Sequence, residues 1–490
     1  MFRLNDVELQ RDSETRPDNK TLLSKKLHRR VVHALLEVPI LLLMSALLFC
    51  GTFWQIFETP TDVTIYHPAR SDAAKYQCYA VAFWQGTQGV NSLPTEQCLF
   101  LKTSGLPSLP QRMQAHGLPA FFIQLVESQH SSLPFHALPF EYSLLALVPF
   151  TLPLVAPAQW YQVVFELLMT LVAVATYFII RQFRSTTAAI VFVGYLVVGS
   201  WATAGGRFDL VPSALTLGVL ILAAKGKWRL AFLLLSLATF CKFYTLVLVI
   251  PLLITQQMQR SDRWYSWRRW EALGIFVLTC AVVLSLSFVM SIEGTLAPIG
   301  YFLYRPIQIE SLPAVLLWLG KFVHHPVHFI KSYGSMNILG SWSGKVSLLS
   351  TLGLVSGLLY TFWLQWRGKL DIFTASLLTL LVMIVGSKVF SPQYLIWAAP
   401  IIAYIWGSNW KWLISWGVVG ILTTYIYPFL YVVPNWAVPL QPAFYPLVLV
   451  RDTIMLGIIL VMLYQATRVK SPRLQPGTSQ FDHTPIGDRH

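Results

Sequence analysis

The sequence predicts an all-α polytopic membrane protein with about twelve transmembrane helices. Hydrophobic residues make up 55% of the 490 positions and charged residues only 12%, against roughly 25% charged in soluble domains. Apolar runs of about 18 residues or more, long enough to cross a bilayer as helices, recur along nearly the whole chain. The net charge of +14 comes from basic residues scattered among these runs and at their ends. This distribution indicates cytoplasmic anchoring rather than binding of nucleic acid.

The N-terminal region predicts a retained signal anchor. Residues 1–30 form a polar tail that ends in a basic cluster, and the apolar run 31–57 follows directly. This run exceeds the roughly 7 to 15 residues of a signal-peptide core and carries no small-residue cleavage site. We therefore expect a cytoplasmic N-terminal tail and a transmembrane domain over residues 31–466.

The largest predicted piece outside the membrane is an outer loop over residues 58–137. Alanine and aromatic side chains recur at helical spacing just after Asp72, and a second apolar run covers 120–126. Both runs are typical of helices that lie in the membrane interface. Cys78 and Cys98 lie in the same loop, and their spacing alone leaves open whether they form a disulfide.

Five spans are predicted between this loop and the next strongly basic loop. An odd number is needed to bring residues 256–270, which contain four arginines, to the cytoplasm. The same count places Arg181, Arg184 and residues 225–229 on the outer side, against the usual distribution of basic residues. The five spans are 140–155, 161–180, 187–201, 210–224 and 230–254.

The C-terminal half follows the positive-inside pattern more closely. We expect a multi-pass plasma-membrane protein with both termini in the cytoplasm. The predicted features, in order, are a span at 271–290, an outer loop at 291–344 with an interfacial helix near 312–323, an inward span ending at 366–369, outer turns at 391–392 and 434–442 around an inner turn at 409–411, a last span at 444–464, and a disordered cytoplasmic tail at 467–490.

Three charged residues at the predicted outer surface have both a structural and a catalytic interpretation. Asp72 precedes a helical run, so it could be an N-cap or a general base held at the membrane surface. Glu141, followed by Tyr142, opens the second predicted span and could anchor that span or contact a substrate. Arg305 could pair with Glu310, or it could hold a phosphate through paired hydrogen bonds.

Charged residues inside predicted spans are informative because each costs about 2.5 to 3.5 kcal/mol at a helix centre. Ion pairs within the bundle and contact with a substrate explain them equally well. Arg451 is a candidate partner for Asp209 or Asp452. The residues of this group are Asp209, Lys242, Lys388, Arg451 and Asp452.

Several motifs are absent from the sequence. It contains no phosphate-binding Gly-rich loop, no dinucleotide fingerprint and no Asp-x-Asp pair for a nucleotide sugar. His324, His325 and His328 form a small cluster, but no acidic or cysteine partner lies at metal-ligand spacing, so we expect no metal site there. A donor dissolved in the bilayer would need no cofactor domain. We therefore expect no cofactor, with a divalent cation left open.

A set of spaced pieces occurs in a fixed order along residues 35–465. The pieces are Asp72 with Tyr76, Glu141-Tyr142, residues 206–212 with Arg207 and Asp209, Lys242-Phe243-Tyr244, residues 305–311, residues 388–397 with Lys388, Gln393 and Tyr394, and Arg451. Together they resemble the family 87 glycosyltransferases of the GT-C superfamily, integral-membrane enzymes that use polyprenyl-phosphate sugars. The chain departs from the family pattern at Ser143 and Leu144, where two prolines are usual, and at Phe302, where a histidine is frequent.

The resemblance implies a GT-C fold and the transfer of a hexose, with mannose expected, from a polyprenyl-phosphate donor to a lipid or glycan acceptor at the outer face. It also implies that Asp72 deprotonates the acceptor, that Arg305 and Lys388 hold the donor phosphate, and that Glu141 orients the sugar or the acceptor. The other residues expected to contact donor or acceptor are Tyr142, Arg207, Asp209, Lys242, Glu310, Gln393, Tyr394 and Arg451.

The residue types suit this chemistry. A lipid phosphate is already a good leaving group, so the reaction needs one base and several cations but no general acid. In-line attack would invert the anomeric centre. The main alternative is a transporter or flippase of lipid-linked sugars, and another is a scaffold without catalysis. A transporter is expected to bind near the midplane between two related halves, whereas these pieces gather on one predicted face and no repeated half is visible.

Overall fold

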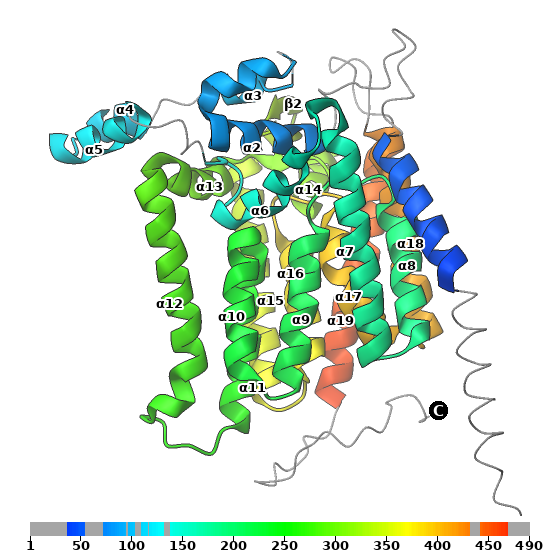
Figure 1. Ribbon diagram of the computed structural model, residues 1–490. Coiled ribbons are helices and arrows are strands. Elements are labelled where there is room, and N and C mark those ends of the chain that lie inside the picture. Colours follow the sequence, from blue (N-terminus) through cyan, green and yellow to red (C-terminus); the bar gives the residue numbers. More distant parts are fainter. Residues whose placement is uncertain are drawn as a thin grey trace, which may run out of the picture.

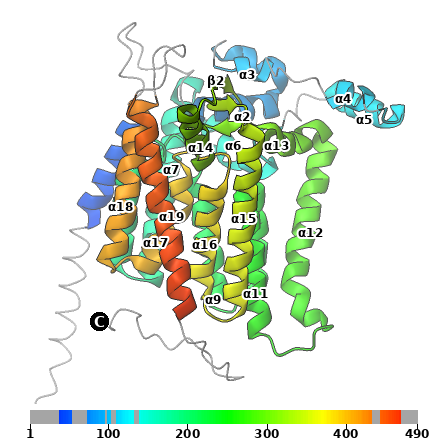
Figure 2. The same cartoon turned by 180° about the vertical axis from the view of Figure 1, so that it is seen from behind.

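The computed structural model describes residues 37–53, 72–94, 97–102, 109–115, 117–131, 138–431 and 442–468. Apolar helices stand side by side in a bundle, and shorter elements cover one end of it (Figures 1 and 2). This architecture confirms a predominantly helical membrane protein. The predicted N-terminal tail, residues 469–490 of the C-terminal tail and nearly all of the predicted outer turn at 434–442 lie outside the described residues.

The bundle consists of helices of unequal length. Ser and Asp side chains cap several of them; for example, Asp371 accepts hydrogen bonds from the backbone N–H groups of Phe373 and Thr374 at 2.9 and 3.2 Å. The helices are Glu37–Phe53, α7 (Tyr161–Phe183), α8 (Thr186–Ser200), α9 (Leu210–Ala224), α10 (Trp228–Cys241), α11 (Val249–Gln259), α12 (Trp267–Met290), α15 (Ser343–Trp366), α16 (Ile372–Gly386), α17 (Tyr394–Trp406), α18 (Trp410–Thr424) and α19 (Phe444–Arg468).

The expected number of about twelve full spans is not met. Among the described residues, five helices are long and apolar enough to cross a membrane by length and composition. Helices α8, α9 and α16 have 15 residues each, or about 22 Å of helix at 1.5 Å per residue, which is shorter than the roughly 30 Å hydrocarbon core. They are short because the apolar runs continue into non-helical turns at the covered end of the bundle.

The predicted span at 140–155 is wrong. This stretch forms three short pieces, η2 (Leu144–Ala146), α6 (Leu147–Thr151) and η3 (Leu152–Val155), which pack beneath α2 (Asp72–Gly89). Pro149 and Pro153 lack the backbone N–H that a continuous helix requires. Hydropathy alone could not separate this apolar, broken segment from a transmembrane helix.

The predicted span at 230–254 is also wrong, because α10 is followed by η5 (Phe243–Leu248) and α11, which run back in the opposite direction. Together these two corrections change the predicted side of the basic loops. Arg181 pairs with Glu37 at the start of the first described helix, with Nη1 3.0 Å from Oε2. The exposed Arg229 pairs with Glu271, with Nη2 2.7 Å from Oε2, at the start of α12. Arg181, Arg184 and residues 225–229 therefore lie at the same end of the bundle as residues 260–271, at the bottom of Figure 1. The outward placement predicted for them is wrong.

A small antiparallel sheet lies in the predicted outer loop 291–344, where only helix was expected. Its strands are β1 (Ile307–Gln308), β2 (Val327–Ser332) and β3 (Ser335–Gly340), in the order β1-β3-β2. Ile338 of β3 is opposite both Ile307 and Phe329. Tyr333 and Gly334 join β2 to β3 with φ angles of 54° and 66°, as a tight two-residue hairpin requires.

The covering layer also contains helices with apolar faces against the bundle. Helix α13 (Ile292–Tyr304) follows α12, and α14 (Leu312–Gly320) buries Ala314, Val315 and Leu317. These side chains join the sheet and the start of α19 in a second hydrophobic core. The predicted interfacial helix at 312–323 is thus α14 followed by a 3-10 turn, and one side of α14 is packed within the protein.

Helix α2 does not lie at a lipid interface as predicted. Nearly all side chains from Ala73 to Phe83 are buried. Short elements cover its outer side, including α3 (Leu99–Lys102), and the bundle lies beneath (Figure 1). The side chain of Gln97 holds this cover in place by donating to Ala74 O at 2.9 Å and to Gln77 Oε1 at 2.8 Å.

The second predicted interfacial helix has a different environment. Helices α4 (Leu109–Ala115) and α5 (Ala120–Ser131) project to one side of the covering layer (Figures 1 and 2). Phe121, Phe122 and Leu125 of α5 are exposed. The interfacial position of α5 stays a prediction.

Cys78 and Cys98 form a disulfide, with Cα atoms 5.7 Å apart. The bond joins the middle of α2 to the segment that covers it. The sequence left open whether Cys78 and Cys98 form a disulfide, and the structure shows that they do.

We predict that single cysteines introduced at Lys227 and Ser261 label from the same side of the membrane and that one at His328 labels from the other. The three positions are exposed at opposite ends of the bundle. The background carries C50A, C241A and C280A, which remove the free thiols. Labelling of K227C together with H328C would restore the topology predicted from the sequence.

We also predict that the double variant C78A/C98A has a lower melting temperature than the native protein. Closing a loop with a sequence separation of 20 residues is worth about 3 kcal/mol. The matched control is C280A, which removes a free cysteine. A reductant should lower the melting temperature of the control but not of the double variant, and equal sensitivity of both would contradict the prediction.

Candidate active site

Polar residues gather where the bundle helices end in non-helical segments beneath the covering layer. One segment, 201–209, joins α8 to α9, and another, 387–393, joins α16 to α17. Gly205 passes so close to α7 that a Cβ there would lie 1.6 Å from Glu166 Oε2. Irregular backbone in a membrane protein is stable where it is buried in protein or lines a polar cavity. These segments therefore mark the candidate site.

Asp72, the first residue of α2, is paired with two cations. Its Oδ2 forms an ion pair with Arg207, 2.5 Å from Nε, and its Oδ1 lies 3.5 Å from Lys75 Nζ. The Asp72 side chain keeps 25% of its surface exposed. Burial alone would raise the pKa of this carboxyl, but the charges of Arg207 and Lys75 outweigh burial and hold the pKa below its usual value of 3.8. The carboxylate is therefore ionised, and each of its oxygens is paired with a cation.

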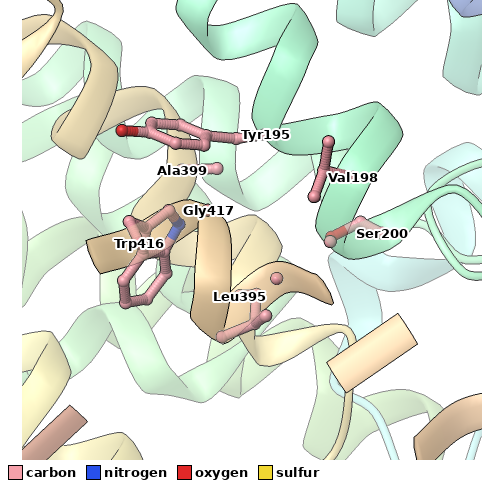
Figure 3. Close-up of a pocket in the computed structure, with 9 residues that line it drawn as sticks. Tyr195, Val198, Ser200, Leu395, Ala399, Trp416 and Gly417 are labelled. Atoms are coloured by element: carbon pink, nitrogen blue, oxygen red, sulfur yellow. The ribbon is translucent and has the colours of Figure 1, made fainter. Parts of the chain in front are cut away.

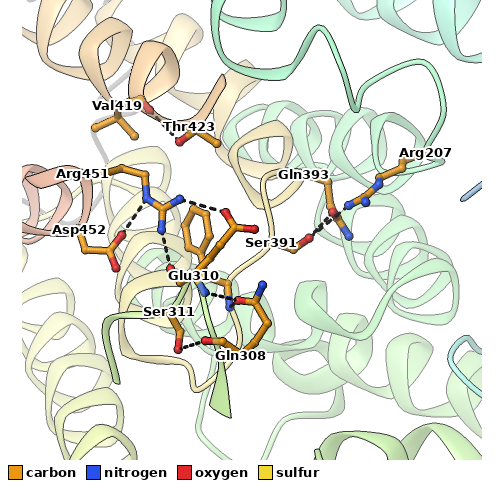
Figure 4. Close-up of polar contacts among 11 residues, drawn as sticks. Arg207, Gln308, Glu310, Ser311, Ser391, Gln393, Val419, Thr423, Arg451 and Asp452 are labelled. Atoms are coloured by element: carbon orange, nitrogen blue, oxygen red, sulfur yellow. Dashed lines mark hydrogen bonds and ion pairs between the residues drawn. The ribbon is translucent and has the colours of Figure 1, made fainter. Parts of the chain in front are cut away.

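Arg207 links Asp72 to the segment 387–393. Its Nη1 donates to Ser391 Oγ at 3.2 Å, and Ser391 Oγ in turn donates to Gln393 Oε1 (Figure 4). The guanidinium also lies over the ring of Tyr427, 5.8 Å from its centroid. Arg207 thus contacts α2, the turn before α17 and the π-helical segment η7 (Tyr425–Leu430) that follows α18.

Asp209 and Lys242 form a buried pair below Asp72. Asp209 Oδ1 accepts from Lys242 Nζ and from Trp397 Nε1, both at 2.5 Å. Trp397 is stacked between Tyr244 and Tyr394, with centroid distances of 4.0 Å to each. Because Asp209 is 0% exposed, its first role is to anchor the end of α10. The predicted alternative partner for Asp209, Arg451, lies elsewhere.

Arg305 and Lys388 lie on the other side of the site. Arg305 Nη2 donates to Ser335 Oγ at 2.9 Å, whereas its buried Nε has no hydrogen-bond acceptor within the described part of the chain. Lys388 Nζ donates to Leu303 O at 3.0 Å. The ion pair between Arg305 and Glu310 that the sequence left open is not formed. The unfilled donor of Arg305 is suited to an anionic ligand.

Glu141 and Lys75 both lie against the β2–β3 turn. A Cβ placed on Gly334 would be 3.4 Å from Lys75 Nζ and 3.9 Å from Glu141 Oε1. Burial, together with the charge of Asp72, raises the pKa of Glu141, while Lys75 and Arg305 offset this only in part. Glu141 therefore ionises less readily than Asp72.

Tyr142 belongs to an aromatic cluster beneath α2. Its ring makes edge contacts with Tyr76 at 5.8 Å and Phe208 at 5.2 Å between centroids. Tyr76 also stacks on Phe150 at 4.2 Å. This cluster fixes α2, and with it Asp72, relative to the bundle.

Glu310 and Arg451 are buried behind the site rather than exposed in it. Arg451 Nη1 lies 3.3 Å from Glu310 Oε2, and its Nε donates to Asp452 Oδ1 at 2.9 Å. All three side chains are at most 3% exposed. Burial raises the pKa of Glu310 to about 7, although Arg451 opposes this. The predicted pairing of Arg451 with Asp452 is confirmed, and the contact of Glu310 or Arg451 with substrate stays a prediction.

Gln308 connects this buried network to the site. Its Oε1 accepts from the backbone N–H of Glu310 at 3.0 Å and of Phe390 at 3.3 Å (Figure 4). Phe390 directly precedes Ser391, the partner of Arg207. The buried charges therefore hold the segment that carries Lys388 and Ser391.

The charges of the site do not balance. Five cations face three carboxylates, which leaves a net charge of +2, suited to a phosphate group. The cations are Lys75, Arg207, Lys242, Arg305 and Lys388, and the carboxylates are Asp72, Glu141 and Asp209.

Lys75 and Gln308 were not identified from the sequence. Lys75 had a usable signal, since residues three apart share a face of a helix and Lys75 follows Asp72 by three. Gln308 had none, because its contacts are with backbone groups that only the fold brings together.

A separate small cavity has a different character. It lies between α8, α17 and α18, and its lining includes Tyr195, Ser200 and Trp416 (Figure 3). None of its lining residues is charged, so it is not part of the candidate site.

The described residues contain no group of three or more His, Cys, Asp or Glu side chains that could hold a metal ion. His325, from the histidine cluster, stacks on Trp342 with the rings 3.8 Å apart and lies 3.2 Å from Ser341 Oγ.

In comparisons with known proteins, no family model matches this chain, and no curated protein matches it.

We predict that E310A lowers the stability by about 3 to 5 kcal/mol, because it removes one partner of a fully buried pair. The matched control is E271A, whose partner Arg229 has a side chain that is 69% exposed; it should cost about 1 kcal/mol or less. Denaturant unfolding of both variants in detergent measures the difference. Equal losses would contradict the supporting role given to Glu310.

Proposed function

We propose that this chain is an inverting membrane glycosyltransferase of the GT-C type, with Asp72 as its general base. It would transfer a hexose, with mannose expected, from a polyprenyl-phosphate donor to a lipid or glycan acceptor. The observation that carries this proposal is a part-exposed, ionised carboxylate, Asp72, at the edge of a cluster with net positive charge. A base and a set of cations are what this reaction needs.

The proposed step is a direct displacement. The acceptor hydroxyl oxygen forms a bond to the anomeric carbon while the bond from that carbon to the phosphate oxygen breaks. The electron pair of the broken bond leaves with the lipid phosphate, and the hydroxyl proton passes to Asp72. Arg305 and Lys388 stabilise the phosphate charge as it develops, and Glu141 orients the sugar or the acceptor.

Two observations support an outer-face site in the plasma membrane with both termini cytoplasmic. The disulfide between Cys78 and Cys98 lies in the covering layer, and disulfides persist in oxidising compartments. The basic loops, including Arg181, Arg229 and Arg269, lie at the opposite end of the bundle, as expected for a cytoplasmic face.

The arrangement supports an enzyme better than a flippase of lipid-linked sugars. A transporter is expected to bind its substrate near the middle of the membrane and between two halves. Here the charged residues of the site lie on segments at one end of the bundle, and a layer of short elements covers that end (Figure 2). The deeper pair, Asp209 with Lys242, is neutralised internally.

We predict that D72N lowers the rate of sugar transfer by about a hundred- to ten-thousand-fold, the usual contribution of a general base. Purified protein is given a radiolabelled polyprenyl-phosphate sugar with candidate lipid and glycan acceptors. The matched control, E271Q, alters a carboxylate at the opposite end of the bundle and should keep its activity.

The same assay separates the alternatives. Transfer that survives D72N would remove the base role of Asp72. No transfer with any donor, together with movement of the donor between leaflets, would favour a flippase. Neither transfer nor movement would favour a scaffold.

A further inference from the structure

The proposed base is blocked in this structure. Asp72 Oδ2 is held by Arg207 Nε at 2.5 Å, and Lys75 lies at the other oxygen. A general base must have an oxygen within hydrogen-bond reach of the proton that it accepts. The acceptor hydroxyl therefore competes with Arg207 unless the guanidinium moves.

We propose that Arg207 is a latch on Asp72, which the phosphate of the lipid donor opens by drawing the guanidinium away from the carboxylate. This inference rests on the proposed function. It makes Asp72 available only when a donor is bound, so that donor binding precedes proton transfer.

The surroundings of Arg207 allow such a movement. A guanidinium has five N–H donors and can engage a phosphate through two of them. Arg207 already reaches from Asp72 to Ser391, three residues beyond Lys388. Its side chain is 15% exposed, so it is not sealed in the core as Arg451 is.

The other proposed phosphate ligands are linked to Arg207 through Tyr394. The Tyr394 side chain lies within electrostatic range of Arg305 and Arg207, and Lys388 lies within range of Arg305. The buried Nε of Arg305 has no acceptor among the described residues. A phosphate between Arg305 and Arg207 would fill this donor and compete with Asp72 for the guanidinium.

Lys75 would keep the carboxylate charged after the latch opens. It follows Asp72 by one helical turn and contacts the oxygen that Arg207 does not use. Removal of Arg207 would therefore leave a carboxylate with one cation, a free oxygen and a higher affinity for a proton.

The latch requires competition between Asp72 and the phosphate, which binding of sugar-free polyprenyl phosphate to protein in lipid nanodiscs can measure. We predict that D72N tightens binding by about tenfold. E141Q removes a carboxylate of the same cluster that forms no ion pair with Arg207, and it should tighten binding by about twofold at most. In the R207Q background, D72N should have no larger effect than E141Q.

A gain of affinity in D72N cannot result from misfolding. The latch is overturned if D72N tightens binding no more than E141Q, or if its larger effect persists in R207Q. In either case the proposed function still stands or falls by the transfer assay. Absence of polyprenyl-phosphate binding in every variant would overturn both proposals.

Discussion

The cost of burying charge organises this protein. A charged side chain removed from water costs several kcal/mol unless an opposite charge and hydrogen bonds compensate it. Arg451 is compensated by Glu310 and Asp452, and Asp209 by Lys242. Each pair joins segments distant in sequence: the first ties α19 to the loop before α14, and the second ties the end of α10 to the turn before α9. The covering layer is therefore fixed to the bundle by charge as well as by apolar packing.

Aromatic packing and a disulfide fix the position of α2, and therefore of Asp72, relative to the bundle. Aromatic stacking of Tyr76 on Phe150 fixes α2 from below, and the disulfide at Cys78 fixes it from above. A carboxylate on a loop would not stay aligned both with Lys75 and with Arg207 of a distant segment. Because α2 is rigid and is held by the disulfide, Arg207 and Lys75 can each contact a different oxygen of Asp72.

The sequence predicted the class of fold because apolar composition and hydropathy do not depend on tertiary contacts. It also placed Asp72, Glu141, Arg207 and Arg305 among the residues that the fold brings together. The prediction failed where an apolar stretch can form either a transmembrane helix or a broken segment buried within the protein. The stretch 140–155 is as apolar as a span, and only its prolines and its packing under α2 distinguish it. This error reversed the side of the predicted spans at 161–180, 187–201 and 210–224 and of the basic loops between them. Residues 256–270 kept their predicted side only because a second error, the prediction of α10 and α11 as one span, offset the first.

The pairing of Asp72 with cations has a physical consequence under the proposed function. A carboxylate beneath a covering layer would take up a proton if it stood alone, since burial favours the neutral form, and a protonated acid cannot act as a base. Nearby cations keep the carboxylate ionised, but they also lower its affinity for the proton that a base must accept. Both requirements can be met if the cation that keeps Asp72 charged at rest is also one that the leaving phosphate attracts. The excess of two positive charges then serves the phosphate, while Lys75 alone remains with the base.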